Sequence, residues 1–228
     1  MERATNLGIV ENIGTTKEPL FRNRGTLTLP SGSNPYFALG DIDRDGIMDI
    51  LVSWGSYATH TLIGYKGIGN WGWERRLEWD TLVPWCKFGV IPALGDMNKD
   101  GFPDIICLGL LSEENNGSIT FFAFENNKEY GFIERQEWAS KETNGQGAAF
   151  HFFPGSIELI DLDGDSDLDI YYITGGFNCP DSIVYQENIG STSPVWKKHK
   201  EFRISIIPHK IVNFDFTLCN MVLLGSLW

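Results

Sequence analysis

The chain has 228 residues, a formal net charge of −12 and a hydrophobic content of 42%. Its acidity excludes the basic surface that nucleic acids and anionic membranes require, and no apolar run reaches the roughly 18 residues of a membrane span. We therefore expect a globular protein with no nucleic-acid partner and no membrane insertion. Residues 1–6 contain no apolar segment, so no signal peptide is predicted in this chain.

The predicted elements are short strands in a repeated order, as 25 Gly and 13% aromatic residues favour. Residues 6–28 read as two strands. Three fuller units of about four strands each follow, and we name their strands A to D in chain order. These units occupy residues 34–82, 88–142 and 150–205. The last segment, 209–228, reads as strands A and B alone, and it complements the C and D strands of residues 6–28.

Units of this length and strand number are typical of β-propeller blades, which bury their faces against their neighbours. We therefore predict an all-β fold, a β-propeller of about four blades. One blade combines residues 6–28 with residues 209–228, so that the ring closes and its free edges are hidden. The alternative is a fragment of a propeller with about six to eight blades.

An acidic turn lies between strands A and B of each unit. It follows the pattern D-x-[DN]-x-D-[GS]-x-x-D and begins at Asp41, Asp96 and Asp161. Twelve of the 30 acidic residues fall in these windows, where carboxylates repel each other unless a cation lies among them. Oxygen ligands without His or Cys favour Ca²⁺ over Zn²⁺ or Cu²⁺, and Mg²⁺ fits less well because it keeps several waters. We predict about three calcium ions.

The predicted ligands are the side chains at positions 1, 3, 5 and 9 of each turn and the main-chain carbonyl at position 7. In the first turn they are Asp41, Asp43, Asp45, Asp49 and the carbonyl of Ile47. In the second turn they are Asp96, Asn98, Asp100, Asp104 and the carbonyl of Phe102. In the third turn they are Asp161, Asp163, Asp165, Asp169 and the carbonyl of Asp167. Gly46 is expected to supply a positive φ, and Ser166 at the same position is expected to strain the third turn. A degenerate fourth loop at 213–221 lacks the ninth acid and is expected to bind metal weakly or not at all.

On these residues the sequence resembles the FG-GAP/VCBS repeat family, which includes the propeller of integrin α-subunits. Residues 161–170 are close to the family's calcium loop, and the Glu-Asn-Ile-Gly segments at 11–14 and 187–190 are similar to the VCBS type. The resemblance implies a calcium-stabilised propeller, usually extracellular or on the cell surface, that serves adhesion or ligand recognition. Integrin-type rings contain more blades than this chain can build.

Three functional interpretations stay open at this point. The first is a calcium-stabilised protein-interaction or cell-adhesion module. The second is a carbohydrate-binding, lectin-like propeller in which Trp54 and Trp71 stack on sugar rings. The third is a piece of a polysaccharide-active enzyme. Because the sequence shows no catalytic constellation, phosphate loop or zinc spacing, we expect no enzymatic activity and a protein or glycan partner.

Overall fold

The structure is a computed structural model that describes residues 5–30, 35–56, 59–84, 86–111, 119–129, 131–139, 141–142, 153–176, 179–190 and 192–204. These residues form strands, joined by turns and one short 3-10 segment, η2 (Gln136–Trp138). Every pair of described strands is antiparallel, and within a sheet each strand pairs with the next one in sequence, except that Lys141–Glu142 pairs with Ile119–Asn126. The all-β prediction is therefore confirmed. Within the described ranges, no helix is long and apolar enough to cross a membrane.

The strands form four successive sheets. The first sheet pairs β1 (Thr5–Asn12) with β2 (Phe21–Leu29). The second contains β3 (Phe37–Gly40), β4 (Asp49–Ser56), β5 (Thr59–Gly67) and β6 (Trp73–Pro84). The third contains β7 (Cys86–Gly95), β8 (Asp104–Leu111), β9 (Ile119–Asn126), β10 (Phe132–Glu134) and β11 (Lys141–Glu142). The fourth contains β12 (Phe153–Ile160), β13 (Asp169–Gly176), β14 (Cys179–Asn188) and β15 (Trp196–Ile204).

Three apolar cores hold the four sheets together, one between each pair of consecutive sheets. Strand β8 shows how one strand serves two cores. Its residues Ile105 and Cys107 point into the core shared with the second sheet, whereas Ile106 and Leu108 point into the core shared with the fourth. All four are 0% exposed. Because alternate residues of a strand face opposite sides, a strand buried on both faces reads as a continuous apolar run.

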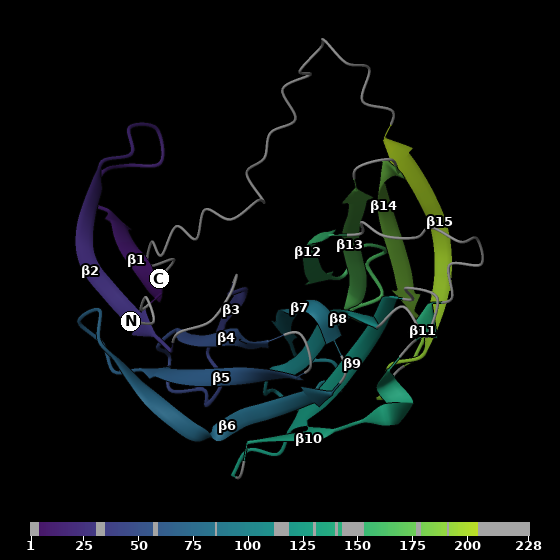
Figure 1. Cartoon of the computed structure of the whole chain (residues 1–228), viewed down its shortest axis with the longest axis horizontal. Helices are drawn as coiled ribbons and strands as arrows, with labels where there is room; N and C mark the ends of the chain where they lie inside the picture. The colour runs from purple at the N-terminus through teal and green to yellow at the C-terminus, as the bar shows by residue number, and fades with distance from the viewer. Residues whose placement is uncertain are drawn as a thin grey trace.

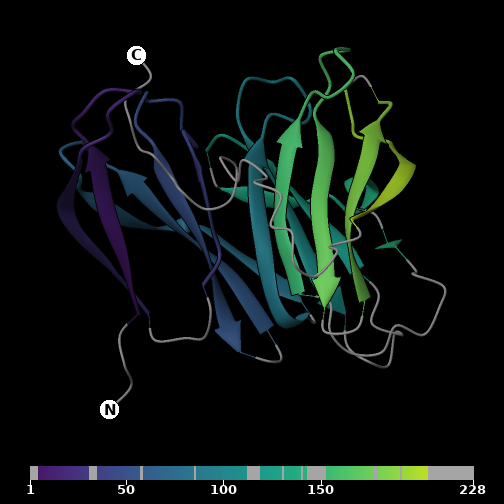
Figure 2. The same ribbon diagram turned by 90° about the horizontal axis from the view of Figure 1, so that it is seen from above.

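The sheets follow one another along an arc, with β3, β7 and β12 on its inner side (Figure 1). Seen from above, they are successive layers along the molecule (Figure 2). Stacked antiparallel sheets of this kind are propeller-like. The described strands form an open arc from β1 to β15, and the predicted closing segment, 209–228, lies outside the described residues.

Glycines at the end of strand A let consecutive sheets approach closely. A Cβ on Gly40 would lie 3.0 Å from Leu94 of the next sheet, and a Cβ on Gly95 would lie 2.9 Å from Leu159 of the one after. Both glycines directly precede the first Asp of an acidic turn. The close approach therefore brings the acidic turns of neighbouring sheets next to each other.

Candidate metal centre

The three acidic turns, which we name loop 1 (residues 41–49), loop 2 (96–104) and loop 3 (161–169), occupy equivalent places. Each connects strand A to strand B of its sheet: β3 to β4, β7 to β8 and β12 to β13. The ninth residue of each loop is the first residue of strand B. The two strands thereby fix both ends of every loop.

The first Asp of each loop folds the turn around its own carboxylate. In loop 1, Oδ1 of Asp41 accepts a hydrogen bond from the N–H of Asp45 (3.0 Å), and Oδ2 accepts one from the N–H of Gly46 (2.9 Å). In loop 2, Asp96 accepts from the equivalent residues, Asp100 and Gly101, whereas in loop 3 Asp161 accepts from the fourth and sixth residues, Gly164 and Ser166. These bonds hold the turn and partly stabilise the carboxylate charge before any metal binds.

Two residues of each loop, the fourth and the sixth, have a left-handed backbone. The sixth residues are Gly46 (φ 85°), Gly101 (φ 90°) and Ser166 (φ 73°), and the fourth are Arg44 (φ 64°), Lys99 (φ 61°) and Gly164 (φ 85°). The positive φ predicted for Gly46 is confirmed. Ser166 adopts the same conformation although its Cβ disfavours it, at a cost of about 1–2 kcal/mol.

The ninth Asp of each loop is a buried link between the start of the loop and two strands. Asp104 is 0% exposed, and it accepts hydrogen bonds from the N–H of Met97 at the start of the loop and the N–H of Asn126 at the end of β9, both at 2.9 Å. Asp49 and Asp169 repeat this arrangement. Burial raises the pKa of Asp49 to about 6 and that of Asp104 to about 7, although the backbone donors act in the opposite direction.

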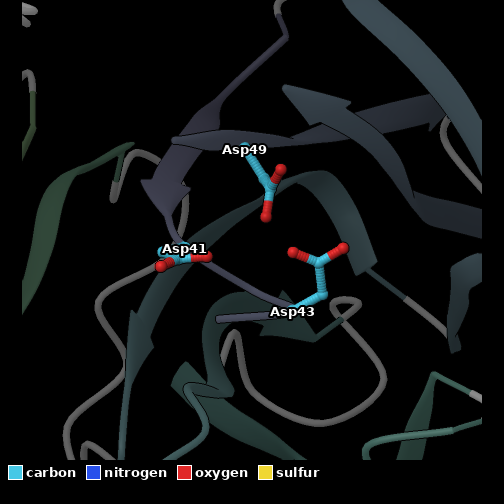
Figure 3. A group of neighbouring side chains, drawn as sticks. All are labelled: Asp41, Asp43 and Asp49. Atoms are coloured by element: carbon cyan, nitrogen blue, oxygen red, sulfur yellow. The ribbon is translucent and has the colours of Figure 1, made fainter. Parts of the chain in front are cut away.

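Side-chain oxygens converge in two of the loops. The carboxylates of Asp41, Asp43 and Asp49 in loop 1 contribute oxygens that lie within 4.8 Å of one another and point toward a common centre (Figure 3). In loop 3 the same limit is met by Asp161, Asp163 and Asp165. Oδ1 of Asp43 is buried and accepts no hydrogen bond. A converging set of oxygens with an unsatisfied buried carboxylate atom fits a hard divalent cation.

A lysine occupies part of loop 1. Lys66 on β5 forms an ion pair with Oδ2 of Asp43 and another with Oδ2 of Asp45, the latter at 2.6 Å. The hydrogen bonds to Asp43 and then Asp45 raise the pKa of Lys66, and the bond from Lys66 lowers the pKa of Asp45. The predicted ligands at positions 3 and 5 of this loop therefore already share a positive charge.

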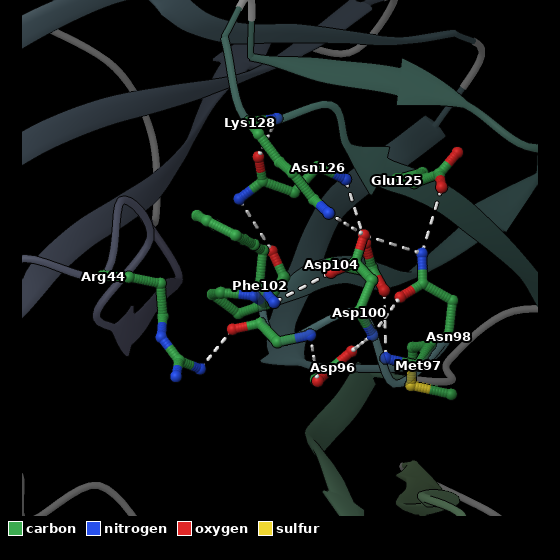
Figure 4. Close-up of polar contacts among 12 residues, drawn as sticks. Arg44, Asp96, Met97, Asn98, Asp100, Phe102, Asp104, Glu125, Asn126 and Lys128 are labelled. Atoms are coloured by element: carbon green, nitrogen blue, oxygen red, sulfur yellow. Dashed lines mark hydrogen bonds and ion pairs between the residues drawn. The ribbon is translucent and has the colours of Figure 1, made fainter.

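Loop 2 differs at its third position, where Asn98 replaces an acid. The Asn98 amide donates to Oε1 of Glu125 (3.0 Å) and to Oδ2 of Asp100 (3.3 Å), and Glu125 is itself paired with Arg135 (Figure 4). Nζ of Lys128 lies 3.3 Å from the same Asp100 oxygen. In the described part of the chain, the acids of loop 2 do not form a third group within the 4.8 Å limit.

The central part of the chain matches a known repeat family. The family model for the FG-GAP-like repeat matches residues 96–172. The resemblance read from the motif is confirmed. This FG-GAP-like segment starts at the first residue of loop 2, contains all of loop 3 and ends at Tyr172 in β13. Searches among curated proteins and among solved structures gave no match.

Neighbouring loops also contact each other through their fourth residues. Arg44 of loop 1 donates to the carbonyl of Gly101 in loop 2, and Lys99 of loop 2 forms an ion pair with the carboxylate of Asp167 in loop 3. The sequence motif did not predict these contacts or those of Lys66. The recurrence of a basic residue at position 4 of the first two loops was the only signal for them in the motif.

The predicted carbonyl ligands are Ile47, Phe102 and Asp167. Their own N–H groups donate to the carboxylates of the fifth residues, at 2.9 Å, 2.9 Å and 2.8 Å respectively. These bonds fix the seventh residue against the loop in all three repeats. The degenerate fourth loop at 213–221 lies outside the described residues.

The two tryptophans considered for sugar stacking lie far apart on the second sheet. Trp54 is near the end of β4 opposite to Asp49, and it packs against the core between the first two sheets. Trp71 follows β5, near the Asp49 end, and Arg24 covers its ring at 5.6 Å from the centroid. The two rings therefore do not form one stacking platform.

Proposed function

We propose that this chain is a calcium-binding, propeller-type interaction module rather than an enzyme. The observation that carries the proposal is the convergence of side-chain oxygens in two equivalent turns, one of which lies within the FG-GAP-like match. The fold supplies sheet faces buried in three cores and an edge lined by turns. Such an architecture leaves the turns as the surface for recognition.

Calcium fits the donor set better than other common metals. The loops offer carboxylate and amide oxygens at positions 1, 3 and 5, with the ninth Asp behind them, and no His or Cys belongs to them. Asp161, Asp163 and Asp165 would hold the ion in loop 3. Asp96, Asn98 and Asp100 would hold it in loop 2, and Asp41, Asp43 and Asp49 in loop 1. Calcium accepts six to eight such oxygens in flexible geometry, whereas magnesium demands a tighter octahedron.

The proposed role of calcium is structural. The ion would neutralise crowded carboxylates at the junction of strands A and B, where the ninth Asp already joins the loop to two strands. We further propose a protein partner and an extracellular or cell-surface location, in line with the FG-GAP-like match. For the ring we propose closure by residues 6–28 and 209–228, and the alternative is still a fragment of a propeller with about six to eight blades.

Calorimetric titration with Ca²⁺, paired with melting curves in Ca²⁺ and in EDTA, tests this function. Each filled site stabilises the fold by about 2.7 kcal/mol at a hundredfold excess over Kd. For a chain of this size, that corresponds to a rise in Tm of roughly 5–10 °C per site. Mg²⁺ at the same concentration serves as the control and should give a smaller shift. A Tm that is the same in Ca²⁺ and in EDTA would refute the structural role.

A further inference from the structure

Strand C of each repeat, which is β5, β9 or β14, ends next to the acidic loop. The residue just before the last residue of this strand differs among the three repeats in a way that bears on metal binding. The last residues of the three strands are Gly67, Asn126 and Asn188. The backbone N–H of each donates to the ninth Asp of its loop, at 2.8 Å, 2.9 Å and 2.9 Å respectively. The preceding residues are therefore structural equivalents. They are Lys66, Glu125 and Glu187. One repeat carries a cation where the other two carry acids.

Lys66 reaches two of the carboxylates that a metal would use. Its ammonium contacts one oxygen of Asp43 and one of Asp45, and only 18% of its side chain is exposed. An ammonium is a compact positive charge with three donors, so it can satisfy two carboxylates at once. A calcium ion that binds the same two carboxylates must displace this ammonium or accept its repulsion at close range.

The other two loops lack this arrangement. In loop 2 the equivalent Glu125 holds the amide of Asn98, and the nearby Lys128 is 45% exposed, so that it can turn toward solvent. In loop 3, no Lys or Arg of the described residues forms an ion pair with the three converging carboxylates, since Lys99 pairs with Asp167 instead. Loop 3 therefore presents the most accessible negative charge of the three loops.

We propose that Lys66 is a built-in counter-ion that replaces calcium in loop 1, so that the three loops are unequal and calcium fills loop 3 first and loop 1 last. This inference rests on the proposed calcium function and refines it. It changes the expectation of about three similar sites to a graded set. Loop 1 is then the loop that holds its shape without a metal ion.

The test compares Lys66→Gln with the matched control Lys17→Gln, because Lys17 is an exposed lysine in the turn between β1 and β2 and has the same charge. Asp165→Asn in loop 3 is the second control. Calorimetric titration with Ca²⁺ should show the weakest class of sites tightening roughly tenfold or more in Lys66→Gln, with no change in Lys17→Gln. Asp165→Asn should lose a tight site.

Two results separate the failure of this inference from the failure of the proposed function. If Lys66→Gln gives the wild-type isotherm while Asp165→Asn loses a site, the inference is wrong and calcium binding stands. If no protein in the series binds Ca²⁺, the proposed function is wrong and the inference falls with it.

Melting curves of the same proteins provide an independent readout. In EDTA, Lys66→Gln should melt below Lys17→Gln, because its loop has lost the internal cation. In saturating Ca²⁺ the gap should close, because the metal takes the place of the ammonium. Equal melting temperatures of the two variants in EDTA would overturn the counter-ion role of Lys66.

Discussion

Replacement of Asp104 by Asn tests whether the ninth Asp stabilises the fold independently of metal. Asp104 is 0% exposed, and each of its oxygens accepts one backbone hydrogen bond at 2.9 Å, from Met97 and from Asn126. An Asn side chain has one acceptor oxygen and one amide group that only donates. Whichever way the amide turns, one buried N–H group then faces another donor and loses its partner.

The size of the effect follows from that lost bond. A buried polar group without a partner costs about 1–3 kcal/mol, and here both the backbone N–H and the new amide are affected. Burial raises the pKa of Asp104 to about 7, so the native carboxylate carries a desolvation penalty that Asn avoids, and this offsets part of the loss. We expect a net loss of roughly 2 kcal/mol, which lowers Tm by about 4–8 °C in a chain of this length.

The assay is thermal unfolding in EDTA, so that any loss of a metal ligand does not contribute. Glu134→Gln is the matched control, because Glu134 is an exposed acid in β10 of the same sheet and its loss changes the net charge equally. Glu134→Gln should melt like the wild type. A Tm of Asp104→Asn within a degree of the control would refute the proposed link between the loop, β8 and β9.

Three further predictions concern packing, protons and a link between repeats. Gly131→Ala should prevent stable folding, because Gly131 has φ 93° and its Cβ would lie 1.8 Å from the carbonyl oxygen of Glu78; soluble, wild-type-like circular dichroism would contradict this. In EDTA, Tm should fall as the pH rises from about 5 to 8. The pKa values of Asp49 (about 6) and Asp104 (about 7) exceed their ordinary value of 3.8, so the folded state holds protons that the unfolded state has lost. A Tm that rises over this range would show the opposite linkage. Asn126→Ala should lower the free energy of unfolding by about 1–3 kcal/mol in urea titrations. The buried Asn126 amide donates to the carbonyl of Ile42 in loop 1 (3.0 Å) and to that of Pro103 in loop 2 (3.2 Å), and an unchanged urea midpoint would count against that role.

The strand order and the position of the acidic turns were predictable because their signals are local. Alternating or continuous apolar runs on either side of an Asp-rich turn predict a hairpin, and the repetition of the turn predicts stacked sheets. The positive φ of Gly46 also follows from the motif alone. These features depend on residues that lie within a few positions of one another.

The occupants of the loops were not predictable, because they come from elsewhere in the chain. Lys66 lies 23 residues after Asp43, and Arg44 contacts a carbonyl 57 residues away. Both contacts exist only because strand C returns to the loop and because the next sheet packs closely against Gly40. The motif places acids at fixed positions, but only the tertiary structure shows which of them are already paired with a cation.

The most direct test of the account is a crystal structure of the protein grown in millimolar calcium. We predict density for an ion in loop 3, with oxygens of Asp161, Asp163 and Asp165 at about 2.3–2.6 Å from it. A second ion should occupy loop 2, and Lys66 should remain against Asp43 in loop 1 until the calcium concentration is raised. Well-ordered loops that contain only water at these positions would contradict the calcium-binding function.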